Sequence, residues 1–161
     1  MMFVNPSMPN LTDFTTYVYA QGVSSTDLPS NSDYLVWALG YALNTALAPP
    51  PTMGGSYVNG ALTASPYVMA VYQLGMHHLV MIAQDVSPST TFTDLRTKYG
   101  FLTFTAGPIV SSEDQGTNET LMEVEWMKSM TLSAMELLKS PWGRMYLQYA
   151  QSYGPNIVGV S

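Results

Sequence analysis

The chain has 161 residues, the length of one domain with its own hydrophobic core, and its net charge is −6. Only five residues are Lys or Arg, which excludes a nucleic-acid-binding protein of the basic-patch kind, because so few cations cannot neutralise many phosphates. No run of about 18 apolar residues occurs, so we expect no membrane span. Cysteine is absent, which excludes a disulfide framework and a thiolate metal site.

The composition also indicates contact with other chains. Charged residues make up 10% of the sequence, against about 25% in an ordinary soluble domain. Twelve Met, three Trp, eleven Tyr and five Phe are more than a core of this size needs. These residue types are enriched at protein interfaces, where Lys, Glu and Asp are depleted. We therefore favour a protein that packs against other chains over an ordinary domain with a neutral polar surface.

The chain is predicted to begin with an arm and a short helix. Residues 1–9 are rich in Pro and Met, and we expect them to form an extended arm. Asn10 can cap a helix that runs to about Gln21, because apolar residues recur there at helical spacing. Gly22 then ends this helix.

A second helix is capped by Ser30 or Ser32 and is predicted to run to about Ala48. The prolines at 49–51 end it, since proline cannot continue a helix. Its predicted core stripe comprises Leu35, Leu39, Leu43 and Leu47, with Val36, Ala42 and Ala46 beside it.

The centre of the domain is predicted to be a third helix. Residues 49–64 are expected to form a loop, because prolines and glycines are frequent there. Ser65 and Pro66 are typical of a helix start, with Pro at the first helical position. Residues 67–84 are apolar on nearly every side, and a helix of this kind is normally covered all round.

The second half of the chain is predicted to add three helices, over 92–99, 124–139 and 142–153, and a β-hairpin at about 109–122. Residues 154–161 follow as a tail. The predicted fold is therefore mainly α: a single domain, 1–161, whose helical body is a small bundle around a central apolar helix, with an inserted β-hairpin and an extended arm at each end.

No constellation of residues predicts an enzyme. His77 and His78 are adjacent on a helix and point about 100° apart, so they cannot share a metal ion as an i, i+4 pair can. We expect one of them to be packed and hydrogen-bonded and the other to lie at an interface. Glu119, Glu123 and Glu125 are interpreted as a solvated acidic face rather than an acid–base pair, because no substrate-binding set accompanies them. No nucleophile elbow, phosphate loop or dinucleotide fingerprint occurs, so we expect no catalytic, metal-binding or cofactor-binding residue.

Four stretches between residues 65 and 161 resemble a known family in their order and spacing. They are Met76-His77-His78-Leu79-Val80, the segment Ile109-Val110-Ser111-Ser112 with Gly116, the element Ser140-Pro141-Trp142-Gly143-Arg144-Met145-Tyr146, and the short uncharged C-terminal tail. They are similar to the Ala-His-Leu-like helix, the Gly/Ser-rich hairpin, the Thr-Pro-Tyr-Gly-x-x-Tyr/Phe element and the tail of the head-to-tail adaptor (connector, or head-completion) proteins of tailed bacteriophages. The predicted helix at 124–139 is longer than that family's pattern.

The resemblance implies a virion structural protein without a cofactor. Such proteins form a ring, commonly of twelve copies, in the neck between capsid and tail, and they are assembled in the host cytoplasm. The implied partners are other copies of the chain, the portal protein, tail or neck proteins, and packaged DNA that passes through the channel without sequence-specific binding. Twelve copies at −6 each would carry −72, which repels DNA rather than gripping it.

Three groups of residues are predicted to carry this function. The hairpin tip is too polar to bury unpaired, so we expect it between subunits or along the channel. The tail is uncharged and contains β-branched apolar residues, so we expect it to dock on the portal as an added strand or in a groove. The tail group is Asn156, Ile157, Val158, Gly159, Val160 and Ser161; the hairpin group is Ser111, Ser112, Glu113, Asp114, Gln115 and Gly116; the family-like group is Pro141, Trp142, Gly143, Arg144 and Tyr146.

Two other classes of function stay open on the sequence. One is a different assembly subunit of a phage or another particle, such as a tail terminator or a capsid accessory protein. The other is a small enzyme or ligand-binding helical domain without a recognisable motif. A defined ring would favour the assembly subunits, and a monomer with a deep polar pocket would favour the last class.

Overall fold

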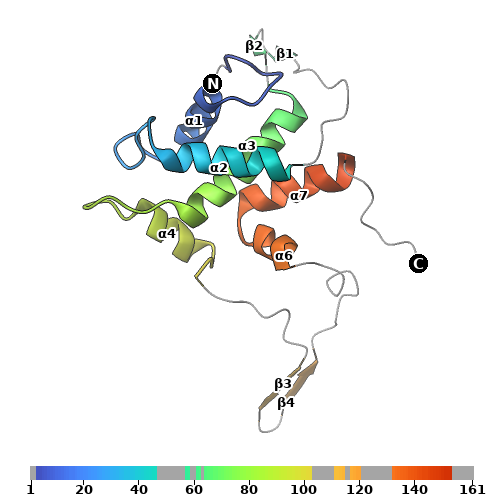
Figure 1. Cartoon of the computed structure of the whole chain (residues 1–161). Coiled ribbons are helices and arrows are strands. Elements are labelled where there is room, and N and C mark those ends of the chain that lie inside the picture. The colour runs from blue at the N-terminus through green and yellow to red at the C-terminus, as the bar shows by residue number, and fades with distance from the viewer. Residues whose placement is uncertain are drawn as a thin grey trace.

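A computed structural model describes residues 3–46, 57–58, 61–62, 64–102, 111–114, 117–120 and 132–153 of the chain. The described residues are mainly helical (Figure 1), which confirms the predicted class. The helices are α1 (Leu11–Ala20), α2 (Asp33–Thr45), α3 (Pro66–Ile82), α4 (Thr91–Lys98), α6 (Leu132–Lys139) and α7 (Pro141–Tyr153). The strands are β1 (Tyr57–Val58), β2 (Ala61–Leu62), β3 (Ser111–Asp114) and β4 (Thr117–Thr120).

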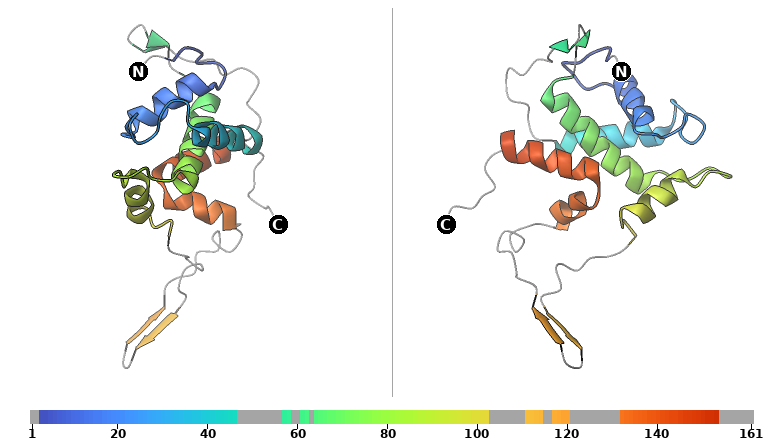
Figure 2. Two further views of the ribbon diagram at one scale, coloured as in Figure 1. Left: turned by 60° about the vertical axis from the view of Figure 1, so that its left-hand side comes forward. Right: turned by 180° about the vertical axis from the view of Figure 1, so that it is seen from behind.

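Helix α3 is the centre of the bundle, as predicted. It contacts α1, α2, α4 and α7, and α6 packs against α7. Helix α2 crosses in front of α3 in Figure 1 and behind it in the reverse view of Figure 2. Eleven of the seventeen residues of α3 are buried, on all sides of the helix. Burial of this kind explains why its sequence shows no polar face.

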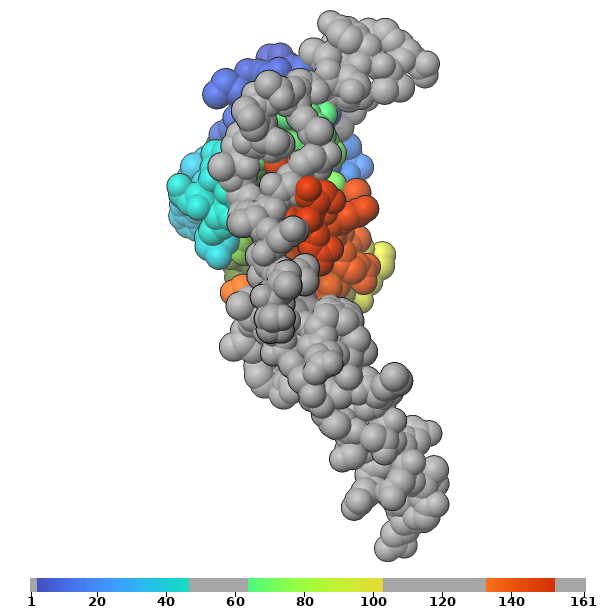
Figure 3. Space-filling model, turned by 90° about the vertical axis from the view of Figure 1, so that its right-hand side faces the viewer, coloured from blue at the N-terminus to red at the C-terminus, as the bar shows by residue number. Residues whose placement is uncertain are grey.

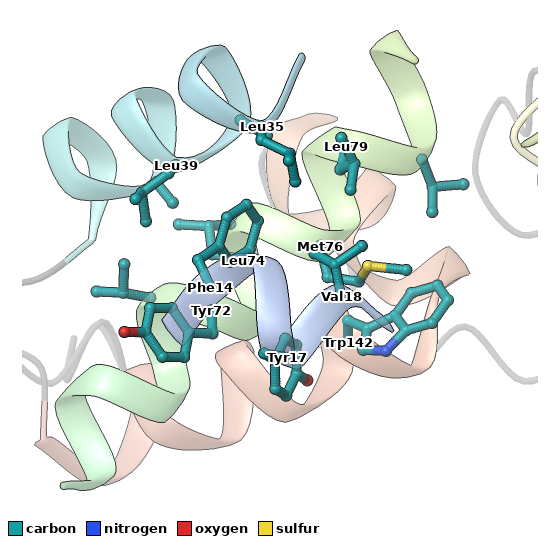
Figure 4. Close-up of a cluster of buried hydrophobic side chains, with 14 of the residues drawn as sticks. Phe14, Tyr17, Val18, Leu35, Leu39, Tyr72, Leu74, Met76, Leu79 and Trp142 are labelled. Carbon is teal, nitrogen blue, oxygen red and sulfur yellow. The ribbon is translucent and has the colours of Figure 1, made fainter. Parts of the chain in front are cut away.

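The start of α3 follows from its first residues. The Ser65 hydroxyl accepts a hydrogen bond from the Val68 N–H at 3.3 Å, and Pro66 occupies the first helical position. Pro is favoured there because its missing N–H would have no partner inside the helix. Further along, Gly75 lets α1 approach closely, because a Cβ atom there would lie 2.9 Å from two ring carbons of Phe14. Figure 4 shows Phe14 in the cluster of buried side chains between these helices.

The first described residues do not form the extended arm that the sequence predicts. The N–H groups of Val4 and Asn5 donate to the two carboxylate oxygens of Asp13, at 2.7 and 2.8 Å. The Pro6 carbonyl accepts from the Ser65 N–H at 2.8 Å. The prediction is therefore wrong for residues 3–9, because Asp13 and the start of α3 supply partners for a backbone that was expected to be free.

Asp13 is almost fully buried and also accepts from the Asn10 amide at 2.7 Å. Burial alone raises the pKa of this carboxyl, but the donors of Val4, Asn5 and Asn10 together lower it below its ordinary value. Asn10 in turn accepts from the Asp13 N–H at 2.9 Å, which confirms it as the cap of α1.

Asp13→Ala is expected to lower the free energy of unfolding by about 1–3 kcal/mol, because it leaves two backbone N–H groups without their acceptors. Asp33→Ala is the matched control: Asp33 also lies in the first turn of a helix but is exposed, so it should cost under about 1 kcal/mol. Guanidinium unfolding followed by circular dichroism measures both. Equal costs for the two variants would contradict the role given to Asp13.

The leucine stripe predicted on α2 is only partly buried. Leu35 and Leu39 face the core (Figure 4), whereas Leu43 is 42% exposed and Leu47 lies outside the described residues. A step of four residues turns about 40° beyond a full helical turn, so two such steps rotate a side chain off the core. Ala38 and Ala42 complete the buried side instead.

Helix α4 is joined to the end of α3 by a polar corner. The Asp85 carboxylate accepts from the N–H groups of Phe92 and Thr93, at 2.7 and 2.8 Å, and so caps the start of α4. The Arg96 guanidinium donates to the carbonyls of Val80 and Ala83, which are the unpaired acceptors at the end of α3. The negative Asp85 therefore lies at the partly positive N-terminus of α4, and the positive Arg96 lies at the partly negative C-terminus of α3.

Both strand pairs are short and antiparallel. The loop predicted over 49–64 contains β1 paired with β2, which the sequence did not predict. Strands β3 and β4 lie within the hairpin predicted at about 109–122, with Ser111 opposite Thr120 and Asp114 opposite Thr117. The rest of that range, and residues 124–131 of the predicted helix 124–139, lie outside the described residues. The hairpin as an insertion in the domain therefore stays a prediction.

Candidate functional site

The family-like element lies at the start of α7, and most of it is buried. Pro141 is the first residue of the helix, and Trp142 and Tyr146 lie one turn apart on the side that faces the core. The Trp142 indole N–H donates to the Gln21 side chain at 3.0 Å, and its ring meets Tyr99 edge-on. Arg144 is exposed. The element therefore joins α7 to the end of α1 and the end of α4.

Ser140 and His77 form a buried pair that links α7 to the central helix. The Ser140 Oγ lies 2.7 Å from the His77 Nδ1, and it accepts a hydrogen bond from the Gly143 N–H at 2.9 Å. Because the hydroxyl accepts from Gly143, its own hydrogen can be donated to His77 Nδ1. The prediction that one histidine is packed and hydrogen-bonded is confirmed for His77.

A serine hydroxyl beside an imidazole is the arrangement that activates the nucleophile of many hydrolases. Here the serine is fully buried and the histidine is 1% exposed, so a substrate carbonyl has no route to the Oγ. The hydroxyl also caps the first turn of α7. The geometry is therefore that of a structural link between α3 and the corner that joins α6 to α7.

The protonation state of the two histidines follows from their surroundings. Burial, together with the nearby His78 and Lys139, lowers the pKa of His77 to about 3. Burial lowers the pKa of His78 to about 4. Both rings are therefore neutral at pH 7. His78 is partly exposed and lies against Tyr41 of α2, with ring centroids 3.9 Å apart; its expected place at an interface between chains stays a prediction.

Gly143 occupies the tightest place in the element. A Cβ atom there would lie 2.8 Å from the carbonyl carbon of Leu137 and 2.9 Å from its Cα, and closer still to the carbonyl oxygen. These are backbone atoms of α6, which cannot move aside as a side chain can. The glycine is therefore required by the close approach of α6 and α7.

The structure describes only part of the hairpin group and none of the tail group. Ser111, Ser112, Glu113 and Asp114 make up β3, opposite β4. Gln115, Gly116 and the whole tail group from Asn156 to Ser161 lie outside the described residues.

No protein-family profile matches the chain, and neither a curated protein nor a solved structure shows significant similarity to it. What supports a function is therefore the chemistry of this chain's own residues, together with the resemblance described above.

The described residues offer little to a small ligand. An open groove of about 380 Å³ lies between Thr26 and Asp27 on one side and residues 86–89 on the other. The Asp27 carboxylate there already accepts from the Thr91 hydroxyl at 2.8 Å. Within the described ranges no three His, Asp or Glu side chains are grouped so as to hold a metal ion, and no helix is long and apolar enough to cross a membrane.

Charge is distributed very unevenly along the chain. Five of the eleven acidic residues lie within residues 111–125, which contain no Lys or Arg. The remaining six acidic and five basic residues leave the rest of the chain with a net charge of −1. The segment around β3 and β4 therefore carries −5 of the total of −6.

Proposed function

We propose that the chain is a virion structural protein that forms a ring between the portal and the tail of a tailed bacteriophage, as a head-to-tail adaptor. Packaged DNA would pass through this ring. The observation that carries the proposal is the division of charge, with a nearly neutral helical body and an acidic segment around β3 and β4.

This division suits a subunit that meets protein on one part and DNA on another. Nearly neutral bodies can pack side by side without strong repulsion between like charges. In a ring of twelve, the acidic segments together would carry −60, at −5 each. If they line the channel, they repel the phosphates and let DNA slide instead of binding it.

The residues of β3 and β4 also support a place outside the core of a subunit. All eight are polar, and Glu113, Asp114 and Glu119 are acidic. An isolated two-stranded hairpin is marginally stable in water, and one without apolar residues has nothing to bury against a core. Figures 1 and 2 show the pair away from the helices. Among the described residues each of the two strands has one edge without a neighbouring strand, and such an edge can pair with a strand of another chain.

The resemblance adds the remaining parts of the proposal. The element at residues 140–146 would hold the body together in each subunit, as its burial and hydrogen bonds in this chain suggest. The tail at 156–161 would dock on the portal, and the tail or neck proteins would bind the opposite side of the ring.

Native mass spectrometry of the full chain, alone and with a portal ring, tests the proposal. We expect a closed oligomer, at least when the portal is present. The chain without residues 112–117 should keep its helical circular-dichroism spectrum but assemble poorly, because the strand pair is lost. The control variant Glu113→Gln/Asp114→Asn/Glu119→Gln keeps the backbone of both strands and should assemble.

Two results would overturn the proposal. One is a wild-type chain that stays monomeric at high concentration with and without the portal. The other is global unfolding of the chain that lacks 112–117, because the strand pair would then belong to the core. Normal assembly of that shortened chain would remove the strand pair from the contacts between subunits.

A further inference from the structure

Residues 3–9 are fastened to the surface of the helical body, and we name this segment the strap. Both oxygens of the buried Asp13 carboxylate accept backbone N–H groups of the strap, those of Val4 and Asn5. In Figure 1 the strap is the dark blue segment before α1, and Figure 3 shows the blue first part of the described chain at the molecular surface. Because a carboxylate removed from water needs donors for its oxygens, Asp13 is a specific acceptor for this backbone.

Helix α3 supplies the other contacts of the strap. The Ser65 N–H, just before this helix, donates to the Pro6 carbonyl at 2.8 Å. The Phe3 ring stacks on that of Tyr72, with centroids 5.9 Å apart, and Tyr72 belongs to the buried cluster in Figure 4. We name Asp13, Ser65 and Tyr72 the strap site. The strap site therefore contacts backbone groups and one aromatic ring of a single short sequence.

The outward side of the strap is apolar and uncovered. Val4 is 79% and Met8 is 65% exposed, and the strap has no charged side chain. Apolar side chains add to stability when they are removed from water. A strap that lies in the site of another copy passes between two bodies, so Val4 and Met8 can be covered there.

The turn that folds the strap back onto its own body lies in solvent. The Asn5 side chain holds this turn by accepting from the N–H groups of Ser7 and Met8, at 3.1 and 3.2 Å, and both hydrogen bonds are exposed. Pro6 and Pro9 lie within the strap, and proline also favours an extended backbone in the residue before it. Opening of the turn therefore exchanges exposed hydrogen bonds for water, and the extended strap spans about 25 Å.

We infer that the strap site takes the strap of a second copy of this chain when copies are assembled. The occupant follows from the site itself: every copy carries the same strap, so the contacts with Asp13, Ser65 and Tyr72 can form between copies unchanged. The inference rests on the proposed assembly of identical copies. A strap reaches its own site at an effective concentration of about millimolar, so exchange needs copies that are held close together.

Two substitutions separate the strap from its site. Val4→Pro/Asn5→Pro removes both donors and leaves the site intact, because proline has no N–H. Asp13→Ala removes their acceptor and leaves the strap intact. The matched controls are Val4→Ala/Asn5→Ala, which keeps both N–H groups, and Asp33→Ala, which removes an exposed aspartate from the first turn of α2.

We expect Val4→Pro/Asn5→Pro and Asp13→Ala each to self-associate at least tenfold more weakly than the wild type in analytical ultracentrifugation, because the hydrogen bonds to the carboxylate are lost. Their equimolar mixture should contain a one-to-one complex that neither forms alone, since the strap of one fits the site of the other. Both controls should associate like the wild type. Circular dichroism checks that each variant is folded. Wild-type association of the separate folded variants, or a mixture without the complex, would overturn the inference.

A peptide provides a second test that does not depend on the folding of a variant. The acetylated peptide of residues 3–9, at about 10 mM, exceeds the effective concentration of the strap in its own chain and should weaken wild-type association at least threefold. The same peptide with Val4→Pro/Asn5→Pro cannot donate to Asp13 and should have no effect. Equal effects of the two peptides, or no effect of either, would contradict the exchange.

The outcome for the strap is separable from that of the proposed function. A ring that all variants still form with the portal would leave the adaptor proposal standing and overturn the exchange. A one-to-one complex in the mixture, from a wild-type chain that forms no ring with the portal, would support the exchange and overturn the adaptor. A wild-type chain that stays monomeric under all conditions would overturn both.

Discussion

Gly143→Ala is expected to lower the free energy of unfolding by about 3 kcal/mol or more, a large part of the about 5–15 kcal/mol that stabilises an ordinary domain. The added methyl group would overlap the backbone of Leu137 at the carbonyl. To relieve this overlap, α6 must move away from α7. That movement would strain the corner at Ser140 and the hydrogen bonds that its hydroxyl makes with Gly143 and His77.

Gly40→Ala is the control for this substitution. The same methyl group meets open space at Gly40 and replaces a poor helix former, so it should raise the stability of the chain by up to about 1 kcal/mol. Guanidinium unfolding of both variants at the same low protein concentration keeps association out of the comparison. A stability of Gly143→Ala within about 0.5 kcal/mol of the wild type would show that α6 and α7 do not approach as closely as described.

The helices that the sequence predicted correctly are those with local signals at their ends. Asn10 begins α1 by accepting the N–H of the third residue along, and Ser65 with Pro66 begins α3 in the same way. Gly22 and Gly100, which have positive φ angles, follow α1 and α4. These signals act over four or five residues, so they can be recognised before any tertiary contact is known.

The errors concern contacts between distant parts of the chain. Residues 3–9 contain Pro and Met and predict an arm. The Asp13 carboxylate, however, accepts from the backbone N–H groups of Val4 and Asn5, and no side chain in the segment reveals these contacts. The spacing of leucines on α2 predicted the burial of Leu43, because a stripe at spacing four ignores how the helix rotates relative to the core.

The candidate site was only partly predictable for the same reason. The sequence indicated that Pro141 starts a helix and that one histidine is packed. The partner of that histidine, Ser140, is 63 residues away, and only the packing of α7 across α3 brings the two together. The need for glycine at 143 likewise depends on the angle between α6 and α7, which no local pattern encodes.

Acidification from pH 6.5 to 4.5 is expected to lower the free energy of unfolding by about 2 kcal/mol through His77 alone. In the fold its pKa is lowered to about 3, so the ring stays neutral over this range, whereas in the unfolded chain it binds a proton near pH 6.5. Below the pKa of the unfolded state, a group that binds a proton only when the chain is unfolded lowers the free energy of unfolding by about 1.4 kcal/mol for each pH unit. Its contribution is complete above pH 6.5 and is lost as the pH falls towards 3.

The carboxylates of Asp13 and Asp85 act at lower pH than His77. For Asp13 and Asp85, burial raises the pKa, but hydrogen bonds, together with Arg96 beside Asp85, lower it below the ordinary value of 3.8. Both groups are therefore ionised in the fold at pH 4.5, and the stability that they contribute is lost only as the pH falls further. The contributions of these two carboxylates are thus separated in pH from that of His77.

His77→Asn separates the two rings. Its carboxamide oxygen can still accept from the Ser140 hydroxyl, but it binds no proton in this range. The loss of stability between pH 6.5 and 4.5 should therefore shrink by about 2 kcal/mol, even though the smaller side chain lowers stability at pH 7. His78→Asn should keep the part of the loss due to His77. Urea unfolding at several pH values measures how the free energy of unfolding of each variant depends on pH. In the folded wild type, the chemical shift of the His77 Cε1–H should stay constant between pH 7 and pH 4. A His77 resonance that titrates near pH 6.5 in the folded chain would show that the ring is accessible to protons, and the buried link between Ser140 and α3 would then be wrong.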